Sequence, residues 1–359
     1  MDFGLSEEQE LLQETVRGFA QNECPTTRLR SSSTRARGTT RRSGRGSSRW
    51  GSRGLIVPEE QGGAGMELLD LALVAELLGE FAVPGPFLGH SLAALGVTLV
   101  ADPAQREAIL PGLADGSQIA TVALQESAFG FAPGEWIAKI EGDRVSGTKA
   151  IVPSAGQADR FLVGLQGGRL AWVDAKGEGV RIEPVEGVDR TRPISTVHFA
   201  GAPASLLGGD EASAWRLLDA ASVLLAADAF GAASKLIDLD VAYSLSREQF
   251  GQPIAQFQAI KHTIARIATD IEPARALFWY AAHAWDHLPE ESARAASVAK
   301  AHLTDRAMDA ARQSVELHGG YGFTWECEVQ MWFKRIMFDR SCLGTPDRHR
   351  ERTAELGGY

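Results

Sequence analysis

The stretch that decides the fold is Arg247-Glu-Gln-Phe-Gly-Gln-Pro-Ile254, followed by Phe257-Gln258-Ala259. It separates two helical patterns: an Ala/Leu-rich run over 217–246, and apolar spacing at three and four residues over 257–288. An arginine on such a turn, with backbone amides and a glutamine nearby, suits a two-pronged grip on phosphate or pyrophosphate. The plainer alternative is an arginine that caps a helix end.

A second motif, Leu317-His-Gly-Gly-Tyr-Gly-Phe-Thr-Trp325, follows another Ala-rich helical pattern over 291–316. Together the two motifs resemble the acyl-CoA dehydrogenase family. The resemblance begins at Leu5-Ser-Glu-Glu-Gln9, continues through Pro58-Glu-Glu-Gln-Gly-Gly63 and reaches Arg350-Glu-Arg352. It therefore covers nearly the whole chain.

Composition is that of an ordinary globular protein, with 359 residues, 44% hydrophobic and 23% charged. No apolar run approaches the roughly 20 residues that span a bilayer, and the start has no basic leader before an apolar stretch, so we expect a cytoplasmic protein without a membrane partner. Three cysteines without paired spacing and eight histidines without ligand spacing predict no metal site. A net charge of −10 gives no general attraction for nucleic acid.

The pattern of apolar and turn residues changes twice along the chain and predicts an α+β fold with three domains. Residues 1–115 read as an N-terminal helical domain, with Leu11, Leu12, Val16 and Phe19 forming an apolar stripe. Residues 116–207 carry short β-type runs between turns, which predict a small barrel or sandwich. Residues 208–359 read as a C-terminal four-helix bundle, with Pro273 perturbing one helix.

Residues 26–53 form an anomalous Arg/Ser-rich segment. Between Cys24 and Pro58 there are nine arginines and seven serines but no Asp or Glu. Taken literally, this is a basic arm for nucleic acid or an acidic partner, although only Trp50 is available for stacking on bases. The family resemblance instead implies a helix here, which favours a disturbance of the reading frame and hence no nucleic-acid partner.

The resemblance implies an FAD-dependent 2,3-dehydrogenation of an acyl-CoA thioester. A carboxylate removes the proton alpha to the carbonyl and the flavin takes the beta hydrogen. Electrons then pass to an electron-transfer flavoprotein. In the family's dimers one subunit holds the flavin ring, and its neighbour's arginine loop reaches the pyrophosphate.

The elements that would be donated to a neighbour's flavin are present. By resemblance they are Arg247, Gln249 and Phe250 in the arginine loop, Gln258 after it, and Gly319 and Gly320 in the diglycine turn. Glu316 departs from the family, which commonly has glutamine there.

The elements that would hold this chain's own flavin match the family's pattern poorly. Only Glu126 and Ser127 match the family's flavin loop. Pro153 lies where the family has a strand beside the flavin ring, and a proline has neither an amide hydrogen nor a hydroxyl to offer.

The family's catalytic glutamate is also missing. It precedes a Gly-Thr pair, where this chain has Leu343, and the alternative position on the first bundle helix is Ala221. The catalytic base is therefore unknown from the sequence. Fallback candidates are Asp339, Asp347 and His349, although a solvated or helix-capping role is the simpler expectation for each.

Three hypotheses follow. The first is a subunit of a heteromeric acyl-CoA dehydrogenase that donates Arg247 to a site in a partner chain. In the family, such complexes often act on bulky steroid side-chain thioesters. The second is a homomeric acyl-CoA dehydrogenase with an unrecognised base. The third is a flavin-free scaffold or binding protein.

Overall fold

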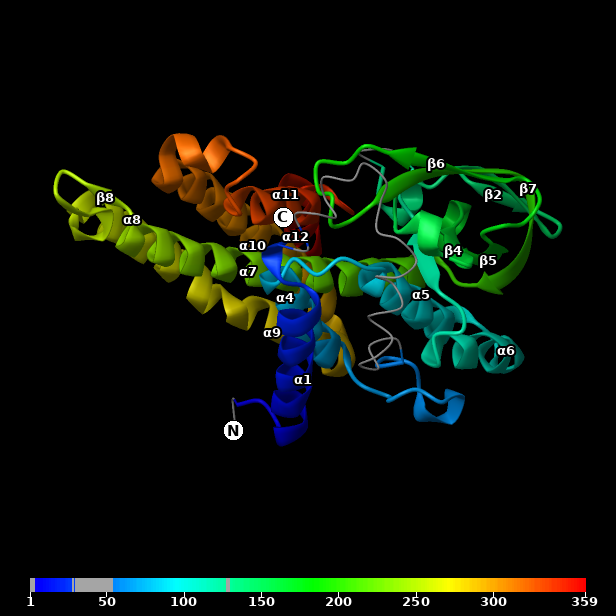
Figure 1. Cartoon of the computed structure of the whole chain (residues 1–359). Coiled ribbons are helices and arrows are strands. Elements are labelled where there is room, and N and C mark those ends of the chain that lie inside the picture. The colour runs from blue at the N-terminus through cyan, green and yellow to red at the C-terminus, as the bar shows by residue number, and fades with distance from the viewer. Residues whose placement is uncertain (1–3, 28, 30–53, 127–129) are drawn as a thin grey trace.

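The computed structural model describes residues 4–27, 29, 54–126 and 130–359. Helices come first, a β-sheet follows, and long helices complete the chain (Figure 1). This order confirms the predicted fold class. The Arg/Ser-rich segment 26–53 lies almost wholly outside the described residues, so both interpretations of it stay predictions.

The first helix shows how the N-terminal region packs. Ser6 caps it by accepting a hydrogen bond from the backbone N–H of Gln9. Its buried stripe is Leu12, Val16 and Ala20, whereas Leu11 is 63% exposed, so including Leu11 in the core stripe was wrong. A shift of one residue turns a side chain by about 100° around a helix. The helices of this region are α1 (Glu7–Glu23), α4 (Leu68–Glu80), α5 (Phe87–Val100) and α6 (Pro103–Ala114).

The middle region is a seven-stranded sheet in the order β1-β4-β5-β7-β3-β2, with β6 also paired to β7. The β1–β4 pair is parallel and all the other pairs are antiparallel. The long last strand joins most of the sheet because it pairs with three others. The strands are β1 (Ala120–Ala123), β2 (Lys139–Glu141), β3 (Arg144–Pro153), β4 (Arg160–Gly164), β5 (Leu170–Asp174), β6 (Val180–Val185) and β7 (Ile194–Gly208).

Helix α7 (Glu211–Ser246) runs the length of the molecule, from the sheet to the hairpin of β8 (Glu248–Gln249) and β9 (Gln252–Pro253) (Figure 1). Asp210 caps its start by accepting from the backbone N–H of Ser213. The helix is long and apolar enough to cross a membrane, but 83% of its most apolar window is buried inside the protein, as in a core helix. The cellular compartment stays a prediction.

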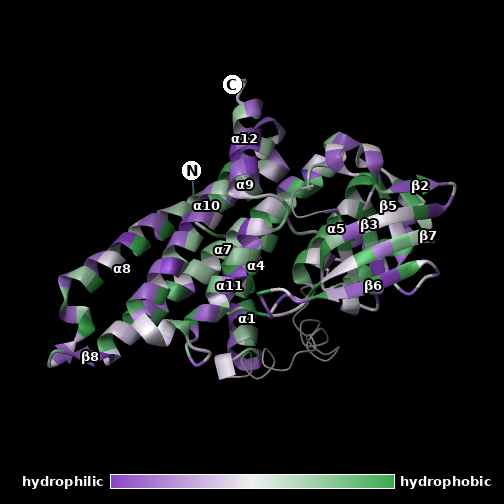
Figure 2. Cartoon of the chain, turned by 90° about the horizontal axis from the view of Figure 1, so that it is seen from above, coloured by the Kyte–Doolittle hydropathy of each residue, from purple (hydrophilic) through white to green (hydrophobic). Residues whose placement is uncertain are grey.

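The other C-terminal helices surround α7. The turn at Glu272–Ala274 contains Pro273 and separates two helices, as the sequence predicted. Helix α12 is mainly hydrophilic and lies at the surface (Figure 2). These helices are α8 (Gln258–Ile271), α9 (Arg275–His287), α10 (Pro289–His318), α11 (Val329–Ser341) and α12 (Pro346–Leu356), with the short η8 (Gly319–Phe323) after α10.

Helices α4 and α7 approach so closely that only glycine fits at two crossing points. A Cβ at Gly79 would lie 2.0 Å from the carbonyl oxygen of Asp228, and one at Gly231 would lie 1.8 Å from that of Glu76. Both distances are far below van der Waals contact. The contact joins the N-terminal helices to the C-terminal bundle in one core.

Candidate functional site

The arginine loop folds as a tight β-hairpin at the far end of α7. Phe250 and Gly251 both have positive φ, 54° and 79°, which is the backbone of a two-residue hairpin turn. Phe250 is 93% exposed. A bulky residue with positive φ at so exposed a position is uncommon, and such strain is often kept for function.

Arg247 ends α7 and lies at the base of this hairpin. Its backbone N–H donates to the carbonyl oxygen of Tyr243, and its own carbonyl accepts from Ile254. The guanidinium is exposed and makes no hydrogen bond or ion pair within the described residues. Gln258 is exposed at the first position of α8. Gln249 is exposed too, and its side-chain amide donates to the carbonyl of Glu248.

The diglycine turn closes helix α10. Gly319 has φ 59° and ψ −142°, a conformation open essentially only to glycine. Gly320 and Glu316 are both exposed. The structure thus presents every predicted donor residue at the surface, on two arms that end at the arginine hairpin and at the diglycine turn.

The two arms touch through aromatic rings that sequence reasoning did not single out. Tyr243 lies one turn before Arg247, and His318 directly precedes Gly319. Their rings stack with centroids 4.2 Å apart and planes 21° from parallel. Tyr321 continues the stack, 6.0 Å from Tyr243. No motif marks such a contact, because it joins residues far apart in the chain.

The flavin-loop position is occupied by a structural ion pair. The carboxylate of Glu126 accepts from Lys149 Nζ at 2.7 Å and from the backbone N–H groups of Ile137 and Ala138. Burial lowers the pKa of Lys149 to about 8, with Glu126 opposing that shift. Glu126 therefore serves the fold here. Ser127, its predicted companion, lies outside the described residues.

At Pro153, where the resemblance places the strand beside the flavin ring, the backbone is hydrogen-bonded within the chain. The carbonyl of Pro153 accepts from the Thr121 hydroxyl at 2.7 Å, and the next backbone N–H, that of Ser154, donates to the carbonyl of Pro193 at 2.8 Å. Since Pro153 has no amide hydrogen and the Ser154 N–H is already used, neither position leaves a backbone N–H for a flavin ring. The backbone at these two positions therefore lacks the donors that the family resemblance implies for a flavin ring.

The position of the family glutamate holds a buried leucine whose backbone is hydrogen-bonded within the chain. Leu343 is buried with φ 55°; its N–H donates to Gln125 Oε1, and its carbonyl accepts from His349 Nε2. Ala221, the alternative position, is fully buried in α7. Neither side chain can accept a proton.

The fallback bases do not replace the glutamate. Burial lowers the pKa of His349 to about 3, far below what a general base at neutral pH needs. Asp347 is exposed in the first turn of α12 and pairs with Arg350. Asp339 is fully buried and its carboxylate pairs with Arg192. The expected solvated role fits Asp347, whereas a solvated role for the buried Asp339 and His349 was wrong.

Asp339 belongs to a buried ionic cluster that joins three elements. Arg335 of α11 donates to both carboxylate oxygens of Asp228 on α7. Arg192, from the connection between β6 and β7, bridges Asp228 and Asp339. Burial, with help from the Asp228 charge, raises the pKa of Asp339 well above its usual range. Burial also acts to raise the pKa of Asp228, but the two arginines overcome it and hold that pKa low.

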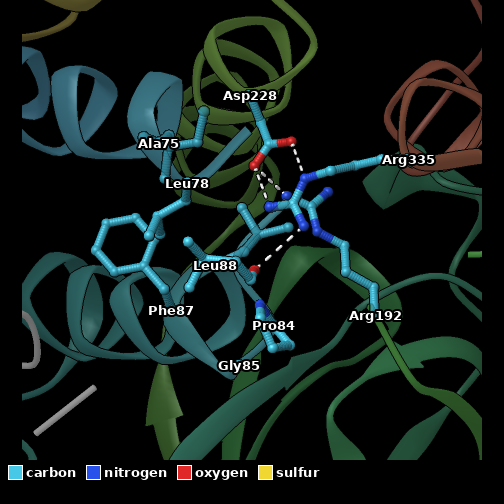
Figure 3. Close-up of a pocket in the computed structure, with 11 residues that line it drawn as sticks. Ala75, Leu78, Pro84, Gly85, Phe87, Leu88, Arg192, Asp228 and Arg335 are labelled. Carbon is cyan, nitrogen blue, oxygen red and sulfur yellow. Dashed lines mark hydrogen bonds and ion pairs between the residues drawn. The ribbon is translucent and has the colours of Figure 1, made fainter. Parts of the chain in front are cut away.

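This cluster forms one wall of a narrow pocket (Figure 3). Arg192, Asp228 and Arg335 face apolar side chains from α4, α5 and α7. The volume is about 30 Å³, enough for one or two water molecules. An acyl chain does not fit without breaking buried ion pairs. The apolar lining comprises Ala75, Leu78, Val83, Pro84, Phe87, Leu88 and Leu224.

Comparison with known proteins supplies the family. The model of the acyl-CoA dehydrogenase N-terminal domain matches residues 6–117, and that of the C-terminal domain matches residues 211–356. Acyl-CoA dehydrogenase IpdE2 of Mycolicibacterium smegmatis is 33% identical over 95% of this chain and 96% of its own length.

Two solved structures place the fold. A Tcur3481–Tcur3483 steroid ACAD variant has a TM-score of 0.89 at 32% identity and covers 98% of both chains. The ChsE4–ChsE5 complex of Mycobacterium tuberculosis has a TM-score of 0.88 at 23% identity, covering 100% of this chain and 99% of that chain, and is similar in fold.

Proposed function

The chain belongs to the acyl-CoA dehydrogenase family of FAD-dependent oxidoreductases, and from this premise we propose that it is the supporting subunit of a heteromeric member. It donates Arg247 and the diglycine turn to a flavin held by a partner subunit, which also carries the catalytic glutamate. The observation that carries the proposal is an asymmetry: the donor residues are exposed, whereas the described acceptor positions make their hydrogen bonds within the chain and lack the family's donors and base.

In such a pair this chain would bind and orient the partner's flavin. Arg247 would bind the flavin pyrophosphate through paired N–H groups, and the exposed diglycine turn, which has no side chains, would let the cofactor approach the backbone closely. The bound flavin would take the beta hydrogen of the acyl group. Among the described candidates none would move the alpha proton, because Leu343 lies at the glutamate position and His349 is too weak a base.

The description of one similar structure supports a substrate class for the complex. The 32% identical structure is described as a steroid ACAD, which supports a bulky, steroid-derived acyl-CoA thioester as substrate of the complex. The narrow pocket beside Arg192, Asp228 and Arg335, at about 30 Å³, is too small for such a group. Reduced flavin would then pass its electrons to an electron-transfer flavoprotein.

The test is the visible absorption spectrum of the purified chain, alone and co-expressed with a second family member that carries the glutamate. We expect no flavin in the lone chain and about one FAD per pair, since one slot of the two is closed. About one FAD per chain without a partner would overturn the proposal in favour of a homomeric enzyme. No flavin in either preparation would point to a scaffold.

The Arg247→Ala variant tests the donor assignment in the same complex. It should assemble, because the exposed side chain makes no hydrogen bond or ion pair within the described residues, yet it should retain less flavin. Unchanged flavin content would refute the role of Arg247. Lys261→Ala, on the exposed face of α8 below the hairpin, is a matched control that removes an exposed cation and should leave flavin content unchanged.

A further inference from the structure

The two donor arms are joined at one place by a compact cluster, defined here as Asp240, Tyr243, Ser314 and His318. Tyr243 and His318 provide the ring stack, and the Tyr243 hydroxyl lies 3.5 Å from the carbonyl oxygen of His318. Beneath the rings, the Ser314 hydroxyl donates to Asp240 Oδ2 at 2.7 Å. The cluster therefore ties the last turns of α7 to the last turn of α10.

His318 is held in a fixed orientation within this cluster. Its Nδ1 lies 2.8 Å from the carbonyl oxygen of Ser314 and 3.5 Å from Asp240 Oδ1. That carboxylate oxygen accepts no hydrogen bond in the structure, although it is buried. The ring thus sits over an unsatisfied acceptor, with Nδ1 facing both oxygens.

The cluster directly precedes both the arginine hairpin and the diglycine turn along the chain. Arg247 follows Tyr243 by four residues and donates its backbone N–H to the Tyr243 carbonyl. Gly319 follows His318 in a conformation that only glycine readily adopts. A shift of about 1 Å between the two rings would therefore change the spacing between the arginine and the diglycine turn, and misplacement on this scale weakens binding of a rigid ligand.

We propose that Tyr243 and His318, supported by Asp240 and Ser314, are positioning residues that set the distance between the arginine hairpin and the diglycine turn. In doing so they set the strength with which this chain grips the partner's flavin. The inference rests on the proposed function. It assigns a role to residues that do not themselves touch the cofactor.

The cluster also makes the grip dependent on pH. Burial raises the pKa of Asp240 to about 7, which the Ser314 hydrogen bond opposes, and burial lowers the pKa of His318. Below pH 7 the Asp240 carboxyl is protonated; above it a buried carboxylate faces His318. The other titratable groups around the adjoining hollow are Tyr321, Glu326, Cys327 and Glu328.

The experiment measures the FAD dissociation constant of the co-expressed pair by fluorescence of released flavin. Tyr243→Leu and His318→Leu should each raise that constant about tenfold, the size of a typical coupling between neighbouring residues. Tyr243→Phe keeps the ring and loses only a 3.5 Å hydroxyl contact, so it should stay within about threefold of the wild type.

A control separates positioning from general loss of stability. Phe161→Leu removes a buried aromatic contact in the sheet, where the ring lies 6.1 Å from that of Phe199. It should destabilise the chain and leave the FAD dissociation constant unchanged. If flavin loss instead follows the melting temperature across all variants, including this one, the positioning role is overturned.

The pH profile gives a second readout. Flavin affinity of the wild-type pair should change between pH 6 and 8, and Asp240→Asn should flatten the change because an amide cannot ionise. Equal slopes in the two proteins would refute the role of Asp240. If Arg247→Ala loses flavin while Tyr243→Leu does not, only this inference fails; if Arg247→Ala retains flavin, the proposed function itself fails.

Discussion

Phe250 places a large aromatic side chain at the exposed tip of the arginine hairpin, with φ at 54°. Asparagine tolerates this region far better than phenylalanine does. Among the described residues the ring meets Phe257 edge-on, with centroids 6.0 Å apart, yet it stays 93% exposed, so packing within the chain does little to explain why phenylalanine stands there. A partner surface that receives the ring explains both its exposure and the strain.

Phe250→Asn should therefore separate stability from function. Relief of the left-handed strain predicts that the isolated chain is unchanged or more stable by up to about 1 kcal/mol, measured by urea unfolding. The co-expressed pair should lose flavin or dissociate more readily, measured by absorbance after gel filtration. A variant that assembles and retains flavin like the wild type would show that the ring contacts no partner.

Leu343 gives a prediction about the missing base. Leu343→Glu buries a carboxylate among groups that are already paired, because the backbone of Leu343 binds Gln125 and His349. We expect a loss of about 3 kcal/mol in unfolding free energy, and no dehydrogenase activity in the lone chain. Leu343→Met, which conserves volume, should cost less than about 1.5 kcal/mol. Activity of the lone glutamate variant would mean that the slot is open after all.

The buried ionic cluster links α7, α11 and the connection between β6 and β7 through ion pairs. Asp228→Ala would leave Arg192 and Arg335 buried without their shared carboxylate, and removing one partner of such a cluster costs about 3–5 kcal/mol. The loss should appear in urea unfolding. Asp347→Ala breaks only the exposed pair with Arg350 and should change little. Equal effects of the two variants would show that the cluster does not hold α7, α11 and the sheet together.

The sequence predicted elements where local chemistry decides them. The start of the hairpin at Arg247 and the turn at Pro273 depend on residues within a few positions, and both were confirmed. The buried face of α1 was partly wrong, because Leu11 and Leu12 are equally apolar and only the packing against other helices selects one. The contact between Tyr243 and His318 joins residues 75 positions apart, so no local pattern could reveal it.

At the scale of the whole molecule, the family resemblance predicted the layered fold, and the pattern of missing residues predicted a defective flavin slot. What the sequence could not show is which contacts the residues at those positions make. Gln125 and the cluster around Arg192 and Asp228 are ordinary polar residues in the printed chain. Their contacts arise only when the sheet, α7 and α11 meet, because burial makes the loss of one partner of an ion pair costly.

Burial also shapes the pH dependence of the folded chain through Glu76 on α4 and Asp240 on α7. Burial raises the pKa of each carboxyl to about 7, opposed by Arg275 for Glu76 and by the Ser314 hydroxyl for Asp240. In the unfolded chain both ionise near pH 4. The folded state therefore holds extra protons between about pH 4 and 7, and the stability contribution of each carboxyl is lost as pH rises through that window.

Glu76→Gln and Asp240→Asn should therefore gain stability relative to the wild type as pH rises from 5 to 8, by on the order of 2 kcal/mol each. Urea unfolding at the two pH values measures the difference. Glu141→Gln is the control: this carboxyl is exposed beside Lys139, which lowers its pKa, so its charge does not change in this range. A wild-type–variant gap that stays constant from pH 5 to 8 would mean that these carboxyls are already ionised in the folded chain, and that Asp240 cannot make flavin affinity depend on pH.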